Sequence, residues 1–121
     1  MSKQQDQVTM YLKILYPDLQ SEVVLNKITG VIDHRHYRLD IWIPSIRCVV
    51  EVHGIQHFKP SGFGMDKEST QFAFHDQMYR DSRLKDICKK FLLNYEQVDY
   101  DEKVSMGMLF KRFDKYVRDE E

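Results

Sequence analysis

Hydrophobic and polar residues alternate in two neighbouring segments, and this alternation predicts a β-hairpin. The segments are Arg38–Ile43 and Arg47–His53, and a Pro-Ser pair typical of a tight turn separates them. A turn at Pro44–Arg47 would place Ile43 opposite Cys48. The hairpin is the most regular pattern in the chain, and the other elements are interpreted around it.

The register of this hairpin brings two carboxylates together. It places Asp40 opposite Glu51, and facing side chains on paired strands have Cβ atoms about 4.5–5.5 Å apart. His53 shares their face, because side chains alternate along a strand. The opposite face is expected to be hydrophobic and to carry Leu39, Ile41, Ile43, Val50 and Val52. Facing like charges destabilise a sheet, so we expect a divalent cation there; the alternative is a solvated face on which the charges never meet.

The remaining periodicity predicts helices and strands on either side of the hairpin. The expected elements are a helix from Ser2 or Asp6 to about Leu15, a strand at Glu22–Asn26, a helix from Asp66 to about Lys90, a strand at Phe91–Val98 and a helix from Tyr100 to about Val117. Turn-forming residues predict a loop between residues 58 and 65. This order predicts an α/β fold in a single domain, residues 1–121, with a central mixed β-sheet flanked by helices.

Composition places the chain among ordinary globular proteins. Of its 121 residues, 42% are hydrophobic and 31% are charged. No apolar run approaches the roughly 20 residues that span a bilayer, and the first residues lack a signal-peptide core. We therefore expect an intracellular protein with no membrane partner. The two isolated cysteines suggest neither a disulfide framework nor a cysteine zinc site.

Charge gives only local indications of a partner. The formal net charge is −1, which exerts no global attraction on nucleic acid. Local basic clusters suit phosphate contacts, although lysines also cover solvated helix faces. These clusters are Arg35-His36-Tyr37-Arg38, Lys85 with Lys89-Lys90, and Lys111-Arg112 with Lys115.

The spacing of the acidic residues resembles a nuclease core. Asp40 is followed, after ten residues, by Glu51-Val52-His53. This resembles the PD-(D/E)xK nucleases, in which an Asp and a Glu on a hairpin bind metal and a Lys positions the attacking water. His53 stands at the position of that Lys.

The residues that follow resemble one branch of those nucleases. The run from Glu51 to Pro60 reads EVHGIQHFKP, and Arg80-Asp81, Lys85 and Cys88 follow on the predicted helix. This pattern, over about residues 38–100, resembles the very short patch repair endonuclease-like branch, which includes phage and homing endonucleases with the signature EDxHD. The resemblance implies a restriction-endonuclease-like fold and a metal-dependent DNA endonuclease that nicks one strand or cuts both, associated with a phage or mobile element.

The resemblance also assigns roles to residues. Asp40 would be the central ligand of Mg²⁺ or Mn²⁺, with Glu51 and the Val52 carbonyl as further ligands. His57 would transfer a proton, for which an imidazole pKa near 6.5 is suitable, and Asp81 would orient its ring. His53 would position water or contact phosphate.

Two sets of residues complete the expected site. The acid that the family carries on its N-terminal helix would be replaced by Asp6 or by Glu22. The expected DNA contacts are Arg38, Gln56, Lys59, Arg80 and Lys85.

DNA is the expected partner, with a homodimer or a larger protein supplying specificity. The alternative functions are a catalytically inactive nuclease-fold module that binds DNA or protein, and a dimeric junction-specific nuclease.

Overall fold

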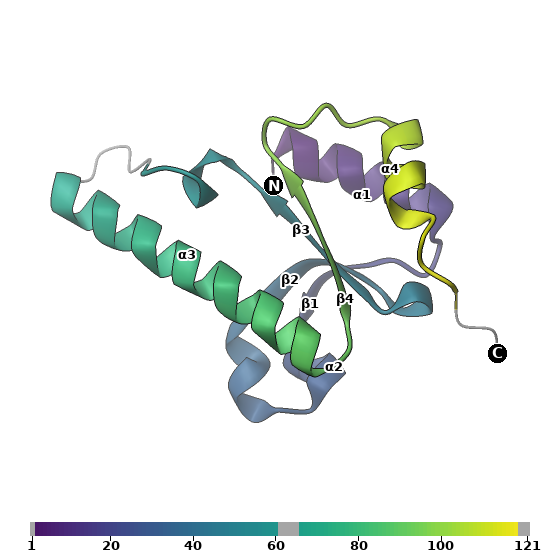
Figure 1. Cartoon of the computed structure of the whole chain (residues 1–121), viewed down its shortest axis with the longest axis horizontal. Helices are drawn as coiled ribbons and strands as arrows, with labels where there is room; N and C mark the ends of the chain where they lie inside the picture. Colours follow the sequence, from purple (N-terminus) through teal and green to yellow (C-terminus); the bar gives the residue numbers. More distant parts are fainter. Residues whose placement is uncertain (1, 61–65, 119–121) are drawn as a thin grey trace.

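A four-stranded mixed sheet lies at the centre of the protein. The computed structural model describes residues 2–60 and 66–118. Its strands are β1 (Gln20–Val24), β2 (Arg38–Ile43), β3 (Cys48–His53) and β4 (Asn94–Asp99), in the spatial order β1-β2-β3-β4 (Figure 1). The first three strands are antiparallel, and β4 runs parallel to β3. The predicted α/β fold class is confirmed.

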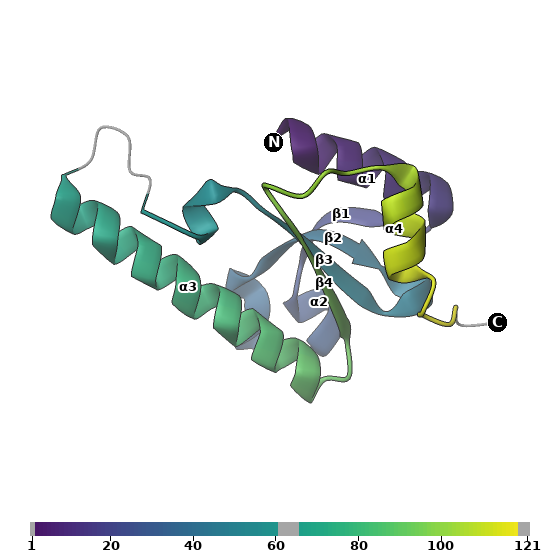
Figure 2. The same ribbon diagram turned by 45° about the horizontal axis from the view of Figure 1, so that its top comes forward.

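Helices cover both faces of this sheet. The α-helices are α1 (Lys3–Leu15), α2 (Asn26–Thr29), α3 (Lys67–Lys90) and α4 (Met106–Phe113), and the 3-10 helices are η1 (Ile32–His36), η2 (Pro44–Ile46) and η3 (Ile55–His57). Helices α1 and α4 lie on one face and α3 on the other (Figures 1 and 2). None of the helices in the described part of the chain is long and apolar enough to cross a membrane.

The central hairpin has the predicted register. Ile43 pairs with Cys48, and the ladder continues to Ile41 and Val50. The turn between the strands is η2, and Arg47 then takes a left-handed conformation with φ of 47°. This conformation closes the turn. The Pro-Ser pair and the alternation together were therefore sufficient to predict the strand pairing.

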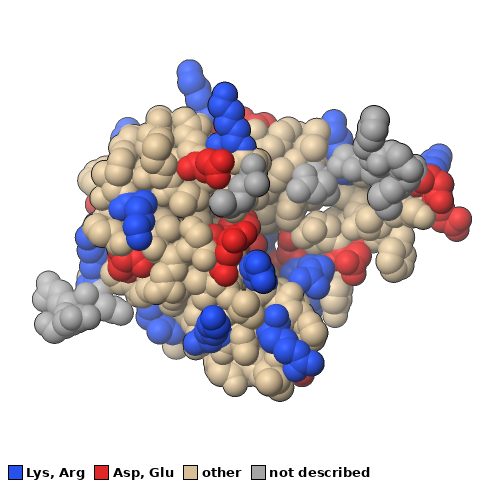
Figure 3. Space-filling view, turned by 180° about the vertical axis from the view of Figure 1, so that it is seen from behind, with Lys and Arg blue, Asp and Glu red and all other residues tan. Residues whose placement is uncertain are grey.

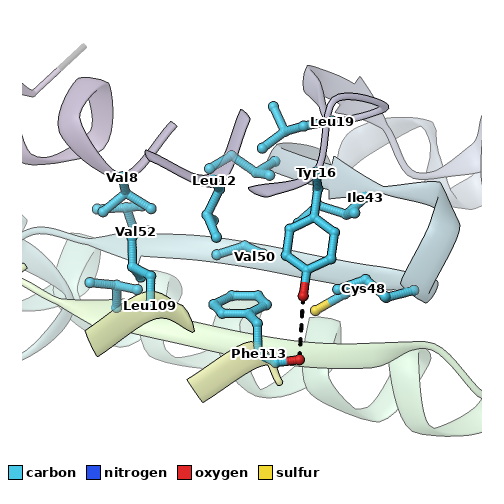
Figure 4. Packing of buried hydrophobic residues seen from close by; sticks show 13 residues of the cluster. Val8, Leu12, Tyr16, Leu19, Ile43, Cys48, Val50, Val52, Leu109 and Phe113 are labelled. Atoms are coloured by element: carbon cyan, nitrogen blue, oxygen red, sulfur yellow. Dashed lines mark hydrogen bonds between the residues drawn. The ribbon is translucent and has the colours of Figure 1, made fainter. Parts of the chain in front are cut away.

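The face of the sheet beneath α1 and α4 is a closed hydrophobic layer. Val50 and Val52 of β3 pack against Val8 and Leu12 of α1 and against Phe113 of α4 (Figure 4). Val8, Leu12, Val50 and Phe113 are fully buried. Burial of this kind contributes about 25 cal/mol per Å² of apolar surface, so this layer is a major source of stability.

Along β3, the face beneath α3 is hydrophobic only near the turn of the hairpin. There, Trp42 and Val49 pack against Leu84, Ile87 and Cys88 of α3. These three residues are the buried residues of α3 and lie toward its C-terminal end; the N-terminal part of the helix extends past the sheet (Figure 1). Polar side chains occupy the other end of this face.

Leu39 corrects one expectation about the hairpin. It was predicted to share the hydrophobic layer of Ile41 and Ile43, but it packs with Trp42 and Leu25 on the α3 side. Leu39 lies opposite Val23 of β1, where the right-handed twist of the strands turns the sheet edge away from α1. Strict alternation therefore fails at this end of β2.

The last helix is shorter than its sequence suggested. It was predicted from Tyr100 to about Val117, but α4 begins only after Ser105, whose side chain accepts a hydrogen bond from the Met108 amide at 3.1 Å. Phe110 is 54% exposed and Val117 is 87% exposed, so neither belongs to the hydrophobic core. A serine N-cap stabilises a helix start by about 1 kcal/mol, which explains where the helix begins.

Candidate functional site

Four polar side chains lie in one row across the sheet. Glu51 is opposite Gln97 of β4, and continuation of the hairpin register places Asp40 opposite Glu51. The β1–β2 register places Glu22 opposite Asp40. Glu22 has a φ of 54°, a conformation that costs about 1–3 kcal/mol in a residue other than glycine. The sheet thus aligns three carboxylates over neighbouring strands.

The facing carboxylates replace part of the backbone ladder. The Asp40 amide donates to Oε2 of Glu51 at 2.8 Å, and the Val52 amide donates to Oδ2 of Asp40 at 2.9 Å. Each carboxylate therefore satisfies one backbone N–H of the other strand. Oδ1 of Asp40 and Oε1 of Glu51 have no hydrogen-bond partner among the described residues, which leaves one oxygen of each group open to a further ligand.

The environment of this pair disfavours two negative charges. Burial, followed by the charge of Asp40, raises the pKa of Glu51 to about 8. Burial also raises the pKa of Asp40, against the hydrogen bond from Val52, which lowers it. Both shifts have the sign expected of neighbouring carboxylates that are buried together. A positive charge placed between them would restore both groups to their ionised form.

A histidine and an aspartate from distant parts of the chain meet beside the carboxylate pair. Nδ1 of His57 lies 2.8 Å from Oδ2 of Asp81, although 24 residues separate them. Oδ1 of Asp81 accepts a hydrogen bond of 2.9 Å from Gln77, one turn earlier on α3. With Asp81 ionised, the proton of this contact belongs to Nδ1, and Nε2 of His57 carries a free lone pair.

The two parts of the site interact electrostatically. His57 acts on the pKa of Asp40, and Asp81 acts on the pKa of Glu51. The His57 side chain is 14% exposed and that of Asp81 is 18% exposed, so both are shielded from water but reachable. The sequence-predicted residues Asp40, Glu51, His57 and Asp81 are therefore brought together on one face of the sheet.

His53 lies beneath His57 as a buried neutral ring. The two imidazole rings stack with centroids 3.9 Å apart and an interplanar angle of 12°. His53 is 2% exposed, and its Nε2 has no hydrogen-bond partner in the described structure; Oδ1 of Asp81 is 3.9 Å away. Burial, together with the neighbouring His57, lowers the pKa of His53 to about 4. An unprotonated His53 can stack on His57 without charge repulsion.

Two groups of residues have donor atoms for a metal ion, and they differ in how well their geometry suits one. Donor atoms of His53, His57 and Asp81 all lie within 4.8 Å of one another. A metal must lie near the plane of each ligating imidazole at about 2.0–2.1 Å, however, and two stacked parallel rings cannot meet this condition for one ion unless a ring turns. In this group, the contact between His57 and Asp81 is a hydrogen bond, and His53 contributes a stacked ring.

The carboxylate pair fits a hard cation better. Mg²⁺ takes oxygen ligands, with one or two carboxylates and several waters, and Asp40 and Glu51 each keep an open oxygen. The N–H and C=O of one strand residue point to the same edge, so the Val52 carbonyl faces β2, as its N–H does. The residues present therefore fit Mg²⁺ or Mn²⁺ at this pair.

The two acids considered for the additional position occupy different places. The charge of Glu22 acts on Asp40 and raises its pKa. Asp6 is exposed on α1, which packs against the opposite face of the sheet through Val8 and Leu12. Of the two, Glu22 is the one placed beside the carboxylate pair.

Strand β4 contributes residues that sequence reasoning did not identify. The Tyr95 hydroxyl donates to Oε1 of Gln97 at 3.0 Å, and Nε2 of Gln97 donates to Oδ1 of Asp99 at 2.7 Å. Asp99 lies opposite His53 in the parallel register and acts on the pKa of that ring. The available signal was the period-two spacing of these three residues, but nothing in the sequence states which strand lies beside β3.

A cavity of about 240 Å³ opens at the histidine pair. It is lined by His53, His57, Asp81, Lys85 and Gln97, among others. The ammonium group of Lys85 lies 5.7 Å from the ring centroid of Tyr95. This cavity places a cation from α3 next to the His57–Asp81 contact, on the β4 side of the site.

The remaining expected DNA contacts are spread around this site. Arg38 and Lys59 are exposed, at the start of β2 and after η3. The guanidinium of Arg80 lies 5.2 Å from the ring centroid of Tyr37. The side chain of Gln56 lies outside the described structure. On the face shown in Figure 3, Asp and Glu side chains gather near the centre and Lys and Arg side chains lie around them.

Comparison with known proteins adds no further constraint. No family model, curated protein or solved structure matches this chain. Its function has to be inferred from the geometry of the site.

Proposed function

We propose that this protein is a metal-dependent DNA endonuclease that hydrolyses phosphodiester bonds. The observation that carries the proposal is the position of an open carboxylate pair, Asp40 and Glu51, beside the hydrogen-bonded pair of His57 and Asp81. The first pair suits a divalent cation, and the second suits proton transfer. Both serve phosphodiester hydrolysis when they act at one phosphate.

The metal-binding part consists of three oxygens. Oδ1 of Asp40, Oε1 of Glu51 and the Val52 carbonyl would hold Mg²⁺ or Mn²⁺. When bound, the cation supplies charge to a phosphate oxygen and lowers the pKa of a bound water. The raised pKa of Glu51 supports this assignment, because a cation would displace the proton that burial and Asp40 favour on that carboxylate.

The proton-transfer part consists of His57 and its partners. Nε2 of His57 accepts the proton of the attacking water, and Asp81 stabilises the imidazolium that results. Gln77 holds the second oxygen of Asp81, so the carboxylate cannot turn away from the ring. His53 supports His57 from below by stacking, and the exclusion of water around these side chains strengthens their interactions.

The proposal is tested by cleavage of supercoiled plasmid DNA in Mg²⁺ or Mn²⁺. Asp40→Asn and His57→Ala proteins should cleave at least about 100-fold more slowly than the wild type, because loss of a general base alone costs about 10²–10⁴-fold. His75→Ala is the matched control, since His75 is an exposed histidine of α3. Equal cleavage by the wild type and both site variants would overturn the assignment.

A second candidate function follows from the backbone hydrogen bonds of the carboxylates. Asp40 and Glu51 each accept an amide of the opposing strand, and this role alone explains their presence in a sheet. The protein would then be an inactive nuclease-fold module that binds DNA or protein. Such a module would bind no Mn²⁺ in calorimetry, even with DNA present, and would leave the plasmid intact.

A further inference from the structure

A trough with guanidinium groups lies between η1 and α3, outside the site described above. Its larger part is a cavity of about 420 Å³ whose lining includes His34, Tyr37, Tyr79, Arg80 and Arg83. A second cavity of about 170 Å³ shares His34 and Arg83 with the first and extends toward the C-terminal end of α3. Together they form one elongated depression along the flank of the helix.

Two arginines in this trough differ in how they are held. Arg80 is preorganised, because its guanidinium stacks on Tyr37 at 5.2 Å and donates to the His36 carbonyl at 2.8 Å. Arg83 is one turn further along the same flank and is exposed. Within the part of the chain that the structure describes, Arg83 has no hydrogen-bond or ion-pair partner. Its donors are open to an external acceptor.

The chemistry of the trough suits a phosphate of a polymer more than a free small anion. Guanidinium groups bind phosphate oxygens in a bidentate manner and stack on planar groups. The carboxylates of Asp33 and Asp86 also line the two cavities, so the local charge is mixed and would bind a free anion poorly. A phosphate of a DNA strand that is already bound at the proposed active site is held close to the trough. It therefore needs only the directional hydrogen bonds of the guanidinium group to bind there.

Helix α3 connects the trough with the proposed active site. Asp81 contacts His57 on one flank of the helix, and Arg80 reaches η1 on the other. A helix with its side chains is about 10–12 Å wide, and successive nucleotides of one DNA strand advance about 3.4 Å along the duplex. Because Arg80 and Asp81 are consecutive residues of α3, a DNA strand with its reacting phosphate at His57 can extend past the helix to the trough.

We propose that the trough between η1 and α3 binds the sugar–phosphate backbone of the DNA substrate a few nucleotides from the phosphate that is cleaved, with Arg83 as its free guanidinium. The identity of this ligand rests on the proposed nuclease function. The trough itself takes no part in the chemistry, so its contribution is to affinity.

Binding without hydrolysis tests this inference. A fluorescent duplex of about 20 base pairs is titrated with protein in EDTA, and its anisotropy is followed over a range of salt concentrations. Arg83→Ala should weaken binding about three- to tenfold at about 0.1 M salt and lower the slope of log K against log salt by about one. Arg83→Lys should recover the slope, because it restores the charge. Inorganic phosphate should not displace the duplex.

Arg118→Ala is the matched control. Like Arg80, Arg118 stacks its guanidinium on a tyrosine, Tyr16, and donates to a backbone carbonyl, that of Leu15, but it lies beside α1 on the other side of the molecule. Its removal should leave binding unchanged. The unfolding midpoint of Arg83→Ala should equal that of the wild type, since Arg83 is exposed. That of Arg118→Ala should fall slightly, because the variant loses the contacts with Tyr16 and Leu15.

The possible outcomes separate this inference from the proposed function. If the wild type binds the duplex and Arg83→Ala binds equally well with the same salt slope, the trough is not a backbone site. If inorganic phosphate competes with the duplex at equal phosphate concentration, a free anion is the ligand and the inference fails. Weaker binding by Arg83→Ala in a protein that never cleaves would overturn the nuclease function while the trough assignment stands. A wild type that neither binds the duplex in EDTA nor cleaves plasmid DNA in Mg²⁺ would overturn both.

Discussion

The two faces of the central sheet are built from the same strands but have different chemistry. Under α1 and α4, alternate residues such as Val50 are fully buried in a continuous apolar layer. Under α3, the apolar packing along β3 extends only from the hairpin turn to about Val49, and Glu51 and His53 follow it. The first face has its polar groups paired; the second contains an unpartnered buried nitrogen and a carboxylate with a raised pKa. Apolar packing is thus concentrated on one face, and the residues of the proposed active site lie on the other.

The largest expected effect comes from a substitution on the closed face, which is the face of the sheet beneath α1 and α4. Phe113→Ala should lower the free energy of unfolding by about 3–5 kcal/mol, because Phe113 is fully buried and its loss leaves a cavity. Phe110→Ala is the control on the same helix, and it should change stability by less than about 0.5 kcal/mol because Phe110 is 54% exposed. Urea denaturation measures both; equal effects would show that the α1–α4 layer is not the main core.

The next effect concerns the open face, which is the face of the sheet beneath α3 that carries Glu51, and it depends on pH. The pKa of Glu51 is about 8 in the folded protein and 4.5 as an ordinary glutamate. Between these values the folded protein holds a proton that the unfolded chain releases, so stability should fall as pH rises through this window. Without metal, Glu51→Gln should therefore be more stable than the wild type at about pH 8 by roughly 4 kcal/mol.

The pH effect is measured by urea denaturation in EDTA at about pH 5 and about pH 8. The advantage of Glu51→Gln should nearly vanish at the lower pH, because both proteins are then neutral at this position. Cleavage should be lost in the variant at both values. A variant that is less stable than the wild type at the higher pH would mean that Glu51 is ionised and well paired in the folded protein.

The smallest expected effect comes from Gln77, and it tests whether this residue orients Asp81 rather than contributing to packing. Gln77→Ala should lower the cleavage rate about tenfold, because Asp81 would lose the hydrogen bond that fixes its second oxygen. Stability should change by less than about 0.5 kcal/mol, as for most surface substitutions. Gln71→Ala on the exposed part of α3 is the control. Unchanged kcat with a raised KM in Gln77→Ala would assign Gln77 to substrate binding instead.

Local periodicity predicted the closed face well and the open face only in part. The alternation of apolar residues and the Pro-Ser turn predicted the pairing of Ile43 with Cys48, and the alignment of Asp40 with Glu51 follows from it. These are short-range features, because a hairpin register is determined by its turn. Leu39 broke the same alternation where the twisted sheet meets β1 and α2.

Residues brought together over long sequence separations could not be derived from periodicity. The contact of His57 with Asp81 joins a 3-10 helix to the middle of α3, and only the resemblance to a nuclease branch suggested it. The chain from Tyr95 to Asp99 was missed because a parallel strand pairs without a turn that fixes its register. Helix ends were also misjudged, as at Ser105, where a cap rather than a hydrophobic stripe determines the start of α4.

The central claim is that the open face binds a divalent cation at Asp40 and Glu51, and calorimetric titration with Mn²⁺ at about pH 8 tests it most directly. The wild type should bind one Mn²⁺ with release of protons, because Glu51 must lose its proton to become a ligand. Asp40→Asn should abolish this binding, and His53→Ala should retain it, since the stacked imidazoles are not the proposed ligands. Mn²⁺ binding that survives Asp40→Asn and is lost in His53→Ala would contradict the account and place the ion at the histidine pair.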